Sequence, residues 1–280
     1  MEVGINFKNI LSYNEHMSKG MDDKLFFLNK INFKKDGYYL FVDFGCADGT
    51  LLDTLYGIME KAGINNVYYI GYDISNTMIE LAKTKFSHFT SSVMFTTSWD
   101  EVKEKVKTYN AMESVLILSS VIHEVYSYAE CQDDIDLFWH RVLDTGFKYV
   151  CVRDMMVGKD INHKPDIDIF QFRENNIPYF TDRIKYYNDF IKHWGSMNEN
   201  KNFIHYLLKY RWTINWDREV HENYFPIYIE DFLKEFEENY NILYLERFRV
   251  PFLEKCWKED FDIEIKDNTH IKTVFEIKRS

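Results

Sequence analysis

The chain has 280 residues, of which 46% are hydrophobic and 18% are aromatic. This composition supports a sizeable buried core and excludes an intrinsically disordered chain. The formal net charge of −11 disfavours broad, non-specific binding to nucleic acid, which requires a basic surface. No apolar run approaches the roughly 20 residues that a membrane-spanning helix needs, so the sequence predicts no membrane span.

Cysteine and histidine usage indicates a reducing compartment and no metal site. The cysteines show no CxxC spacing, which favours free thiols in a cytoplasmic protein and argues against structural zinc. The histidines also lack the spacing of metal ligands. The first stretch, "MEVGINFKNILSYNEHMSKG", lacks the basic, apolar and small-residue segments of a signal peptide. We therefore expect a cytoplasmic protein without a metal cofactor.

Between 38 and 155, short apolar runs alternate with helical patterns. The apolar runs are 38–44, 67–73, 92–97, 114–120 and 147–154, and the helical patterns are 49–63, 75–86, 99–109 and 133–146. Such alternation is typical of a parallel sheet that is covered by helices on both faces.

After 155 the strand rhythm stops, and the patterns at 181–195 and 200–220 are helical and aromatic. A helix at 226–240 and strands at 241–250 and 270–278 follow. The sequence thus predicts one α/β domain with a helical insertion over the carboxyl edge of its sheet. The expected parts are an N-terminal helical segment that closes over the ligand (1–37), a core (38–155), a helical cap (156–226) and a C-terminal helix with strands that complete the sheet (227–280).

The turn "DFGCADG" at 43–49 follows the first strand, at the sheet edge where α/β proteins bind ligands. Its spacing Gly45-x-Ala47-x-Gly49 is one residue shorter than GxGxxG, the nicotinamide fingerprint that directs a helix N-terminus at a pyrophosphate. Asp43 and Asp48 would repel a pyrophosphate, whereas carboxylates suit a cation. S-adenosylmethionine (SAM) carries an ammonium and a sulfonium and no phosphate, so the turn favours SAM.

Polar residues also follow the next three strands. Asp73 ends the second strand, where a carboxylate can accept both hydroxyls of a ribose. That feature is shared with nicotinamide-binding folds, so it indicates a nucleoside without choosing between the two. Ser98 and Trp99 follow the third strand and could flank an adenine ring, and Ser119 and Ser120 end the fourth strand.

In order and spacing, "VDFGCADG", "IGYDISNTMIELA" and "LSSVIHEV" resemble the motifs of class I SAM-dependent methyltransferases. The segment "PIYIEDFLKEFEENYNILYLERF" resembles the last helix and penultimate strand of that family. The resemblance covers 38–155 and 226–278. It implies a Rossmann-like sheet of seven strands, mostly parallel with an antiparallel last strand. It also implies SAM as the methyl donor and S-adenosylhomocysteine as the product.

The resemblance also implies roles for individual residues. Asp43 would face the methionyl ammonium, Gly45, Ala47 and Gly49 would form the turn, and Asp73 would hold the ribose. The other cofactor-binding residues would be Cys46, Ile74, Met78, Ser98, Trp99, Ser119 and Ser120. Ala47 stands where the family often has glycine, and its methyl is tolerable if φ stays negative. Each of these roles has an alternative explanation. The two aspartates could be strand-end acids that cap neighbouring turns, and the glycines could form a tight turn without a ligand. Trp99 could simply pack against the sheet.

His123 and Glu124 follow the fourth strand at the lip of the expected pocket and are the candidate catalytic residues. Methyl transfer from a sulfonium is an in-line displacement, so positioning contributes most, and a base is needed only if the nucleophile carries a proton. A histidine can accept that proton near neutral pH. Glu124 could orient His123 or contact the substrate. Alternatively, His123 caps the strand or bonds the backbone, and Glu124 is a solvated acid.

The candidate substrate-binding residues are Tyr13, His16, Arg153, Lys209 and Arg211. Arg153 could equally form a local ion pair with Asp154. Around Lys209 and Arg211, basic and aromatic residues interleave, a pattern that can stack bases and hold phosphates. The same pattern is typical of a packing face with a charged rim.

The sequence therefore predicts a methyltransferase that moves a methyl group from SAM to an oxygen, nitrogen or carbon nucleophile. The aromatic cap and the acidic net charge favour a small-molecule acceptor held under the cap. Two alternatives remain open. One is an RNA-modifying methyltransferase that uses the basic and aromatic insertion, and the other is a catalytically silent SAM-binding partner protein.

Overall fold

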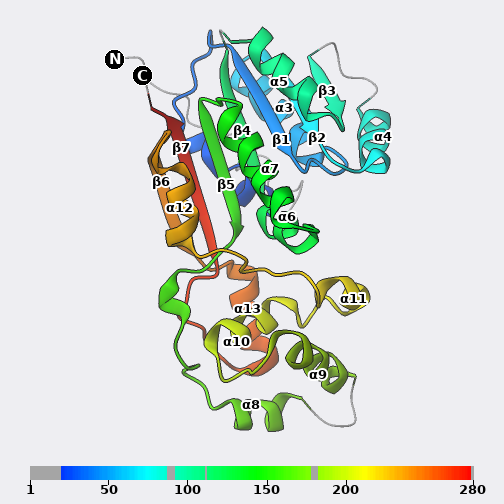
Figure 1. Cartoon of the computed structure of the whole chain (residues 1–280), viewed down its shortest axis with the longest axis vertical. Helices are drawn as coiled ribbons and strands as arrows, with labels where there is room; N and C mark the ends of the chain where they lie inside the picture. Colours follow the sequence, from blue (N-terminus) through cyan, green and yellow to red (C-terminus); the bar gives the residue numbers. More distant parts are fainter. Residues whose placement is uncertain (1–19, 87–91, 111, 178–181, 279–280) are drawn as a thin grey trace.

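The computed structural model describes residues 20–86, 92–110, 112–177 and 182–278. Seven strands form one sheet in the order β3-β2-β1-β4-β5-β7-β6 (Figure 1). They are β1 (Tyr39–Phe44), β2 (Val67–Tyr72), β3 (Val93–Thr96), β4 (Glu113–Ser119), β5 (Tyr149–Met155), β6 (Tyr240–Phe248) and β7 (His270–Ile277). The first five pair in parallel, and β7 is antiparallel to both β5 and β6. This confirms the expected Rossmann-like sheet with its antiparallel last strand.

Helices cover both faces of this sheet (Figure 1). One face carries α5 (Trp99–Thr108), α7 (Gln132–Asp144) and α12 (Ile229–Glu237), and the other carries η1 (Phe26–Asn29), α3 (Thr50–Ala62) and α4 (Asn76–Lys85). Each set of helices buries its own apolar core against the sheet. The short helices α2 (Met21–Lys24) and α6 (Ile122–Tyr128) lie near the carboxyl edge, before η1 and after β4 respectively. β1 is buried along its whole length, as a central strand covered on both faces should be.

A smaller helical lobe lies beyond the carboxyl end of β5 (Figure 1). It contains η2 (Lys159–Ile161), α8 (Ile169–Asn176), α9 (Arg183–Trp194), α10 (Asn200–Lys209), η3 (Thr213–Asn215) and α11 (Trp216–Glu219). A further helix, α13 (Pro251–Phe261), joins the lobe although it lies between β6 and β7 in the sequence. Its Trp257 is fully buried in the apolar core of the lobe, and the indole N–H donates to the carbonyl of Leu207 at 2.9 Å.

The sequence analysis assigned no element to 251–261. The apolar side of α13 finds its partner only in a lobe built from distant segments, and local periodicity does not reveal that partner. The segment that leads from β5 into the lobe and the segment that leads from the lobe to α12 lie side by side, because Val157 pairs with Tyr228 in a parallel bridge. Within the described part of the chain, no helix has the length and apolar character to cross a membrane.

Candidate functional site

A cleft opens at the carboxyl edge of the sheet. β1 and β4 are neighbours in the sheet without being consecutive strands, and ligands bind open α/β sheets at such a switch point. The cleft has a volume of about 330 Å³, within the usual range for small-molecule pockets. Its walls come from the turn after β1, the end of β2, α6 and α7, and they include Gly45, Asp73, Ile74, Glu124, Leu137 and Arg141.

The turn after β1 contains three residues with positive φ. The values are 76° for Gly45, 46° for Ala47 and 78° for Gly49. A Cβ on Gly49 would lie 2.6 Å from Phe86, and one on Gly45 would lie 2.8 Å from Val121, so packing alone requires both glycines. Ala47 is exposed, and a non-glycine residue in this region carries about 1 kcal/mol of strain. The condition under which a methyl at this position is tolerable, a negative φ, is therefore not met.

Asp73 stabilises this turn. Its Oδ2 accepts the N–H of Ala47 at 2.9 Å, and its Oδ1 accepts the N–H of Ser75 at 2.8 Å. Each carboxylate oxygen has a second lone pair, and the residue lines the cleft. Asp73 can therefore hold the turn and accept two hydroxyls of a ribose at the same time.

Asp43 lies at the neighbouring strand end and is only 3% exposed. Burial raises the pKa of Asp43 to about 7, with Lys24 opposing the rise and Asp73 adding to it. Within the described part of the chain, no group donates a hydrogen bond to this carboxylate. A buried carboxylate without a donor is costly unless a proton or a cation meets it. Asp43 is thus suited to hold a cationic group beside the turn.

Apolar side chains dominate the rest of the cleft. Ile74, which is 80% exposed, lines it together with Val125 of α6 and Leu137 of α7. Arg141 also lines the cleft, and its Nη1 donates to the hydroxyl of Tyr72 at 3.1 Å. Such a slot fits a flat, mainly apolar ring. The sequence analysis missed Leu137 and Arg141, because the side of α7 that borders the cleft is set by tertiary packing.

Several residues expected to bind the cofactor have side chains engaged elsewhere. Ser98 caps α5 by accepting the N–H of Glu101 at 3.4 Å. Trp99 is 5% exposed and packs in the core beside Phe44, with ring centroids 5.3 Å apart. The structure therefore favours the packing interpretation of Trp99 over adenine stacking. Among the residues expected to bind the cofactor, Gly45, Asp73 and Ile74 line the cleft. The others do not line it, namely Asp43, Cys46, Ala47, Gly49, Met78, Ser98, Trp99, Ser119 and Ser120.

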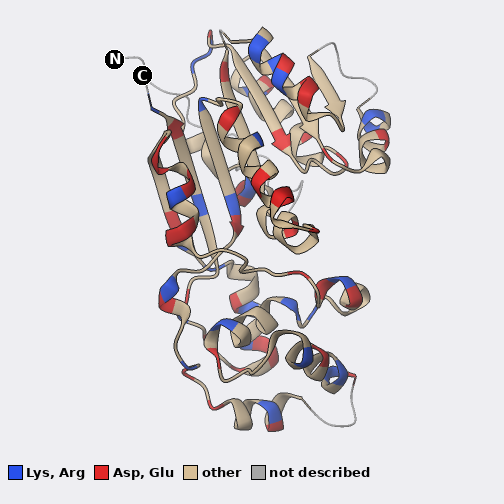
Figure 2. Ribbon diagram, in the orientation of Figure 1, with Lys and Arg blue, Asp and Glu red and all other residues tan. Residues whose placement is uncertain are grey.

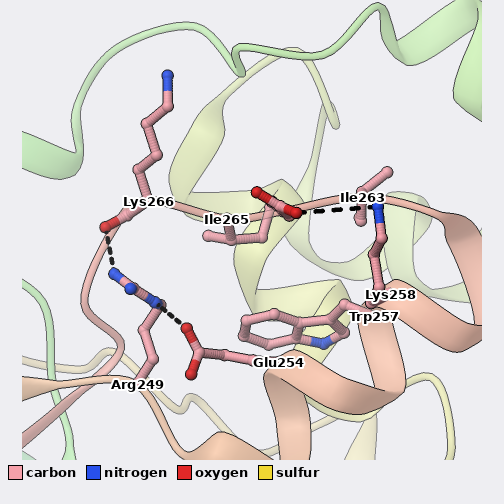
Figure 3. Close-up of a pocket in the computed structure, with 8 residues that line it drawn as sticks. Arg249, Glu254, Trp257, Lys258, Ile263, Ile265 and Lys266 are labelled. Carbon is pink, nitrogen blue, oxygen red and sulfur yellow. Dashed lines mark hydrogen bonds and ion pairs between the residues drawn. The ribbon is translucent and has the colours of Figure 1, made fainter.

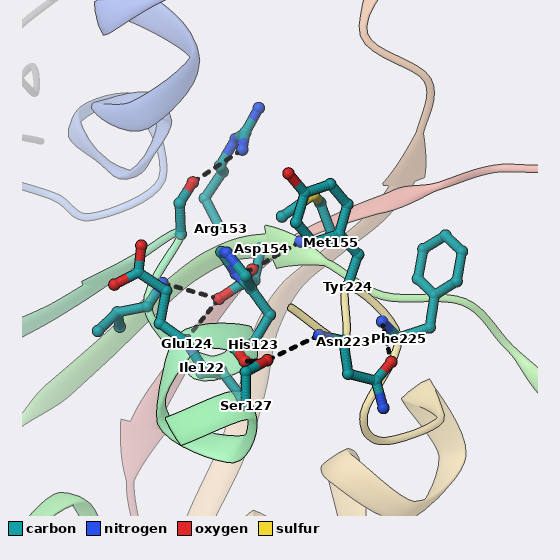
Figure 4. Close-up of polar contacts among 12 residues, drawn as sticks. Ile122, His123, Glu124, Ser127, Arg153, Asp154, Met155, Asn223, Tyr224 and Phe225 are labelled. Carbon is teal, nitrogen blue, oxygen red and sulfur yellow. Dashed lines mark hydrogen bonds and ion pairs between the residues drawn. The ribbon is translucent and has the colours of Figure 1, made fainter. Parts of the chain in front are cut away.

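His123 forms a buried pair with Asp154 of β5 (Figure 4). Its Nδ1 lies 2.7 Å from Asp154 Oδ1, and the two residues are 5% and 0% exposed. Burial alone would lower the pKa of His123, but the Asp154 carboxylate raises it above its ordinary value. The N–H groups of Val121 and Ile122 donate to Asp154 Oδ2 at 3.0 and 2.7 Å. Because Nδ1 is engaged, Nε2 is the atom left to exchange a proton.

Glu124 lines the cleft but does not orient His123, since Asp154 has that role. Its Oε1 pairs with Nη2 of Arg218 from the helical lobe at 3.0 Å. Burial raises the pKa of Glu124, while His123 and Arg218 oppose the rise. Glu124 therefore connects the wall of the cleft to the helical lobe.

Arg153 makes a local ion pair, but its partner is Asp23 rather than Asp154. Its Nη2 lies 2.8 Å from Asp23 Oδ2, and its Nη1 donates to Ser120 Oγ at 3.0 Å. Ser119 Oγ is buried and has no hydrogen-bond partner among the described residues. Arg153, Ser119 and Ser120 thus lie together at the ends of β4 and β5. The two serines precede His123 in the sequence, and Arg153 precedes Asp154, the partner of His123.

Lys209 and Arg211 have partners inside the protein. Lys209 is 0% exposed, and its Nζ donates to the carbonyls of Glu219 and Glu222, the latter at 2.7 Å. This enclosure contradicts the expected contact between Lys209 and a substrate. Arg211 pairs with Asp260 at 2.7 Å. The last two expected substrate residues, Tyr13 and His16, lie outside the described residues.

A second hollow of about 530 Å³ borders α13 (Figure 3). There Arg249 pairs with Glu254 at 2.5 Å and donates to the carbonyl of Lys266 at 2.6 Å, and Lys258 lies near Glu264 at 3.8 Å. The charged groups of this hollow therefore already have partners. No group of three or more His, Cys, Asp or Glu residues in the described ranges could hold a metal ion. The cleft at β1 and β2 is the stronger candidate site.

No family model and no curated protein matches this sequence. Solved structures with a similar chain path include the N-methyltransferase NodS from Bradyrhizobium japonicum WM9, with a TM-score of 0.40, 8% identity, and coverage of 87% of this chain and 88% of that one. The cyclopropane synthase MmaA2 from Mycobacterium tuberculosis has a TM-score of 0.48, 9% identity, and coverage of 92% and 82%. A SAM-dependent methyltransferase from Archaeoglobus fulgidus has a TM-score of 0.45, 10% identity, and coverage of 96% and 99%. The fold assignment rests on the strand order of this chain.

Proposed function

We propose that this chain is a SAM-dependent methyltransferase that acts on an oxygen, nitrogen or carbon nucleophile of a small molecule. The observation that carries the proposal is Asp43, a buried carboxylate that has no hydrogen-bond donor among the described residues and lies beside a strained turn. A phosphate-bearing ligand would meet the charges of Asp43 and Asp73, whereas an ammonium would meet a counter-ion. The motif resemblance and the seven-strand order support the same family.

The residues of the cleft, together with Asp43 and the turn after β1 beside it, fit each part of SAM. Asp43 would hold the methionyl ammonium, and Asp73 would accept the ribose hydroxyls. Ile74 and Leu137 would enclose the adenine in the apolar part of the cleft. Gly45 and Ala47 are exposed in the turn, so their backbone can approach the ligand.

When bound, SAM supplies an electrophilic methyl group. For an acceptor that carries a proton, His123 would take that proton at Nε2, while Nδ1 stays on Asp154. The Asp154 carboxylate then stabilises the imidazolium, as in other histidine–carboxylate pairs. Its raised pKa makes His123 a stronger base than a free histidine. The buried surroundings fix the ring, and positioning is the main contribution to an in-line displacement.

We further propose that the helical lobe covers the acceptor near His123. The basic residues of the interleaved stretch are engaged within the protein: Lys209 is enclosed, Arg211 pairs with Asp260, and Arg218 pairs with two carboxylates. Acidic and basic positions are interspersed along its helices (Figure 2). A small-molecule acceptor therefore suits the lobe better than RNA. The four cysteines are free, which agrees with the proposed cytoplasmic location.

The test is incubation of the purified protein with methyl-labelled SAM and a cell extract that is separated into RNA, protein and small-molecule pools. We expect label in the small-molecule pool, abolished by Asp73→Ala and reduced by His123→Ala. Label in RNA would instead support the RNA-modifying alternative. SAM binding without any labelled product would contradict the proposed activity and support a silent SAM-binding protein.

A further inference from the structure

One segment of the helical lobe, residues 219–225, runs against α6 and is called the strap here. Lys209 holds it from the side of the lobe. The Lys209 side chain is fully buried, and its Nζ donates to the carbonyls of Glu219 and Glu222. The same Nζ lies 3.8 Å from the centroid of the Tyr224 ring. Lys209 thus contacts the strap at three points.

The two hydrogen bonds from Lys209 to the strap do not depend on the charge of Lys209. Burial lowers the pKa of Lys209 to about 7, and the nearby Glu219 and Glu222 oppose that shift. An ammonium has three N–H donors and a neutral amine has two. Both forms can therefore serve the two carbonyls, and the strap stays attached on either side of neutral pH.

On its other side, the strap bonds α6 (Figure 4). The N–H of Asn223 donates to Ser127 Oγ at 2.7 Å, and Ser127 Oγ donates to the carbonyl of His123 at 2.6 Å. The Tyr128 hydroxyl donates to Glu222 Oε1 at 2.7 Å. The strap is therefore joined to the helix that carries His123 at two successive residues of α6.

Tyr224 brings the strap into direct contact with the His123 ring. The two ring centroids are 5.4 Å apart and the planes meet at 79°, an edge-to-face contact. The backbone N–H of Tyr224 donates to Nε2 of the buried His205 at 3.3 Å, which fixes the strap at this residue. Asp154 and Tyr224 thus restrict the His123 imidazole from two directions, through a hydrogen bond and through a ring contact.

We propose that Lys209 is a positioning residue that acts through the strap on His123. It holds Tyr224 against the imidazole, so that the ring keeps its place and stays shielded from water on the side of the helical lobe. The inference rests on the proposed function for its catalytic consequence, since His123 is the base proposed there. The restraint that the strap places on the His123 ring is inferred from the contacts alone. It assigns a role to a buried lysine that neither cofactor binding nor proton transfer uses.

The experiment compares Lys209→Met with Lys192→Met. Lys192 lies on α9 of the same lobe and is exposed, so the control makes the same chemical change without removing any of the contacts between Lys209 and the strap. The first readout is hydrogen exchange of the amides at 219–225. The second is the rate at which diethyl pyrocarbonate acylates His123, followed by mass spectrometry of the peptide. Because Lys209→Met removes the donor for two carbonyls, it should raise both the exchange rate and the acylation rate about tenfold. Lys192→Met should leave both rates unchanged.

If Lys209→Met does not fold, Ser127→Ala breaks the strap on its other side and should speed the same two rates. The inference would be overturned if hydrogen exchange of the strap amides and acylation of His123 were as slow in these variants as in Lys192→Met. With active protein, kcat should fall about tenfold while the SAM Kd stays unchanged, and an unchanged kcat would also overturn it. If the wild type binds SAM but methylates nothing, the proposed function fails. The exchange and acylation rates then still decide the role of the strap.

Discussion

Asp43 makes SAM binding depend on pH in a way that can be calculated. Its pKa in the free protein is raised to about 7, and a bound ammonium requires the ionised form. The apparent Kd is then multiplied by 1 + 10^(pKa − pH), which is roughly 1.1 at pH 8 and roughly 11 at pH 6. Binding should therefore weaken about tenfold between pH 8 and pH 6. Because an α-amino group titrates near 8, affinity should also fall above about pH 8.

Isothermal titration calorimetry with SAM and S-adenosylhomocysteine from about pH 5.5 to 8.5 measures this dependence. At pH 7 the binding should release about half a proton, which buffers of different ionisation enthalpy reveal. Asp43→Asn should remove the acid limb and keep the alkaline limb. Asp48→Asn is the matched control in the same turn, because hydrogen bonds from Thr50 and Lys85 overcome burial and lower the pKa of Asp48. A flat affinity between pH 6 and pH 8, or an acid limb that persists in Asp43→Asn, would refute the reasoning.

Asp43 should also make folding stability depend on pH, in the opposite direction to SAM binding: stability falls as the pH rises. Burial raises the folded-state pKa of Asp43 from 3.8 to about 7, so the folded state holds the extra proton between these values. Its stability contribution is present below pH 4 and is lost as pH rises through 7. At pH 8 the charged form costs up to about 4 kcal/mol, at about 1.36 kcal/mol for each pKa unit. Asp43→Asn should therefore raise Tm at pH 8 and change it little at pH 4, while it weakens SAM binding.

Four further outcomes are expected. Asp73→Asn should weaken SAM binding on the order of 100-fold in calorimetry, because it removes a charged acceptor and disturbs the turn. Asp154→Asn should lower the pKa of His123, which moves the acid limb of the pH–rate profile to lower pH and reduces kcat without changing the SAM Kd. Turnover should not change between low and physiological salt, and a steep fall would support an RNA substrate. Ala47→Gly should change stability by less than about 1 kcal/mol in urea unfolding.

The core sheet was predictable because its parallel strands are buried on both faces and appear in the sequence as continuous apolar runs. Once the strands are parallel and ordered, their carboxyl ends meet, which brings Asp43 and Asp73 to neighbouring strand ends without further information. The directions of individual side chains could not be predicted in this way. Trp99 follows β3 at the expected place, yet its ring turns into the core beside Phe44. Lys209 lies on an amphipathic helix whose buried side is set by the strap, a segment that packs there only in the folded protein.

The backbone strain at Ala47 is not required for packing of the turn, in contrast to the glycine conformation at Gly49. Its φ of 46° carries about 1 kcal/mol of strain, which its N–H to Asp73 helps to hold. Replacement by glycine relieves the strain but adds about 0.4–1 kcal/mol of unfolded-state entropy, so the two effects nearly cancel. Gly49→Ala, in contrast, places a Cβ 2.6 Å from Phe86 and adds overpacking of about 1–3 kcal/mol to the same strain. If urea unfolding gave Ala47→Gly a loss as large as that of Gly49→Ala, Ala47 would be unstrained, and its conformation would no longer point to a ligand.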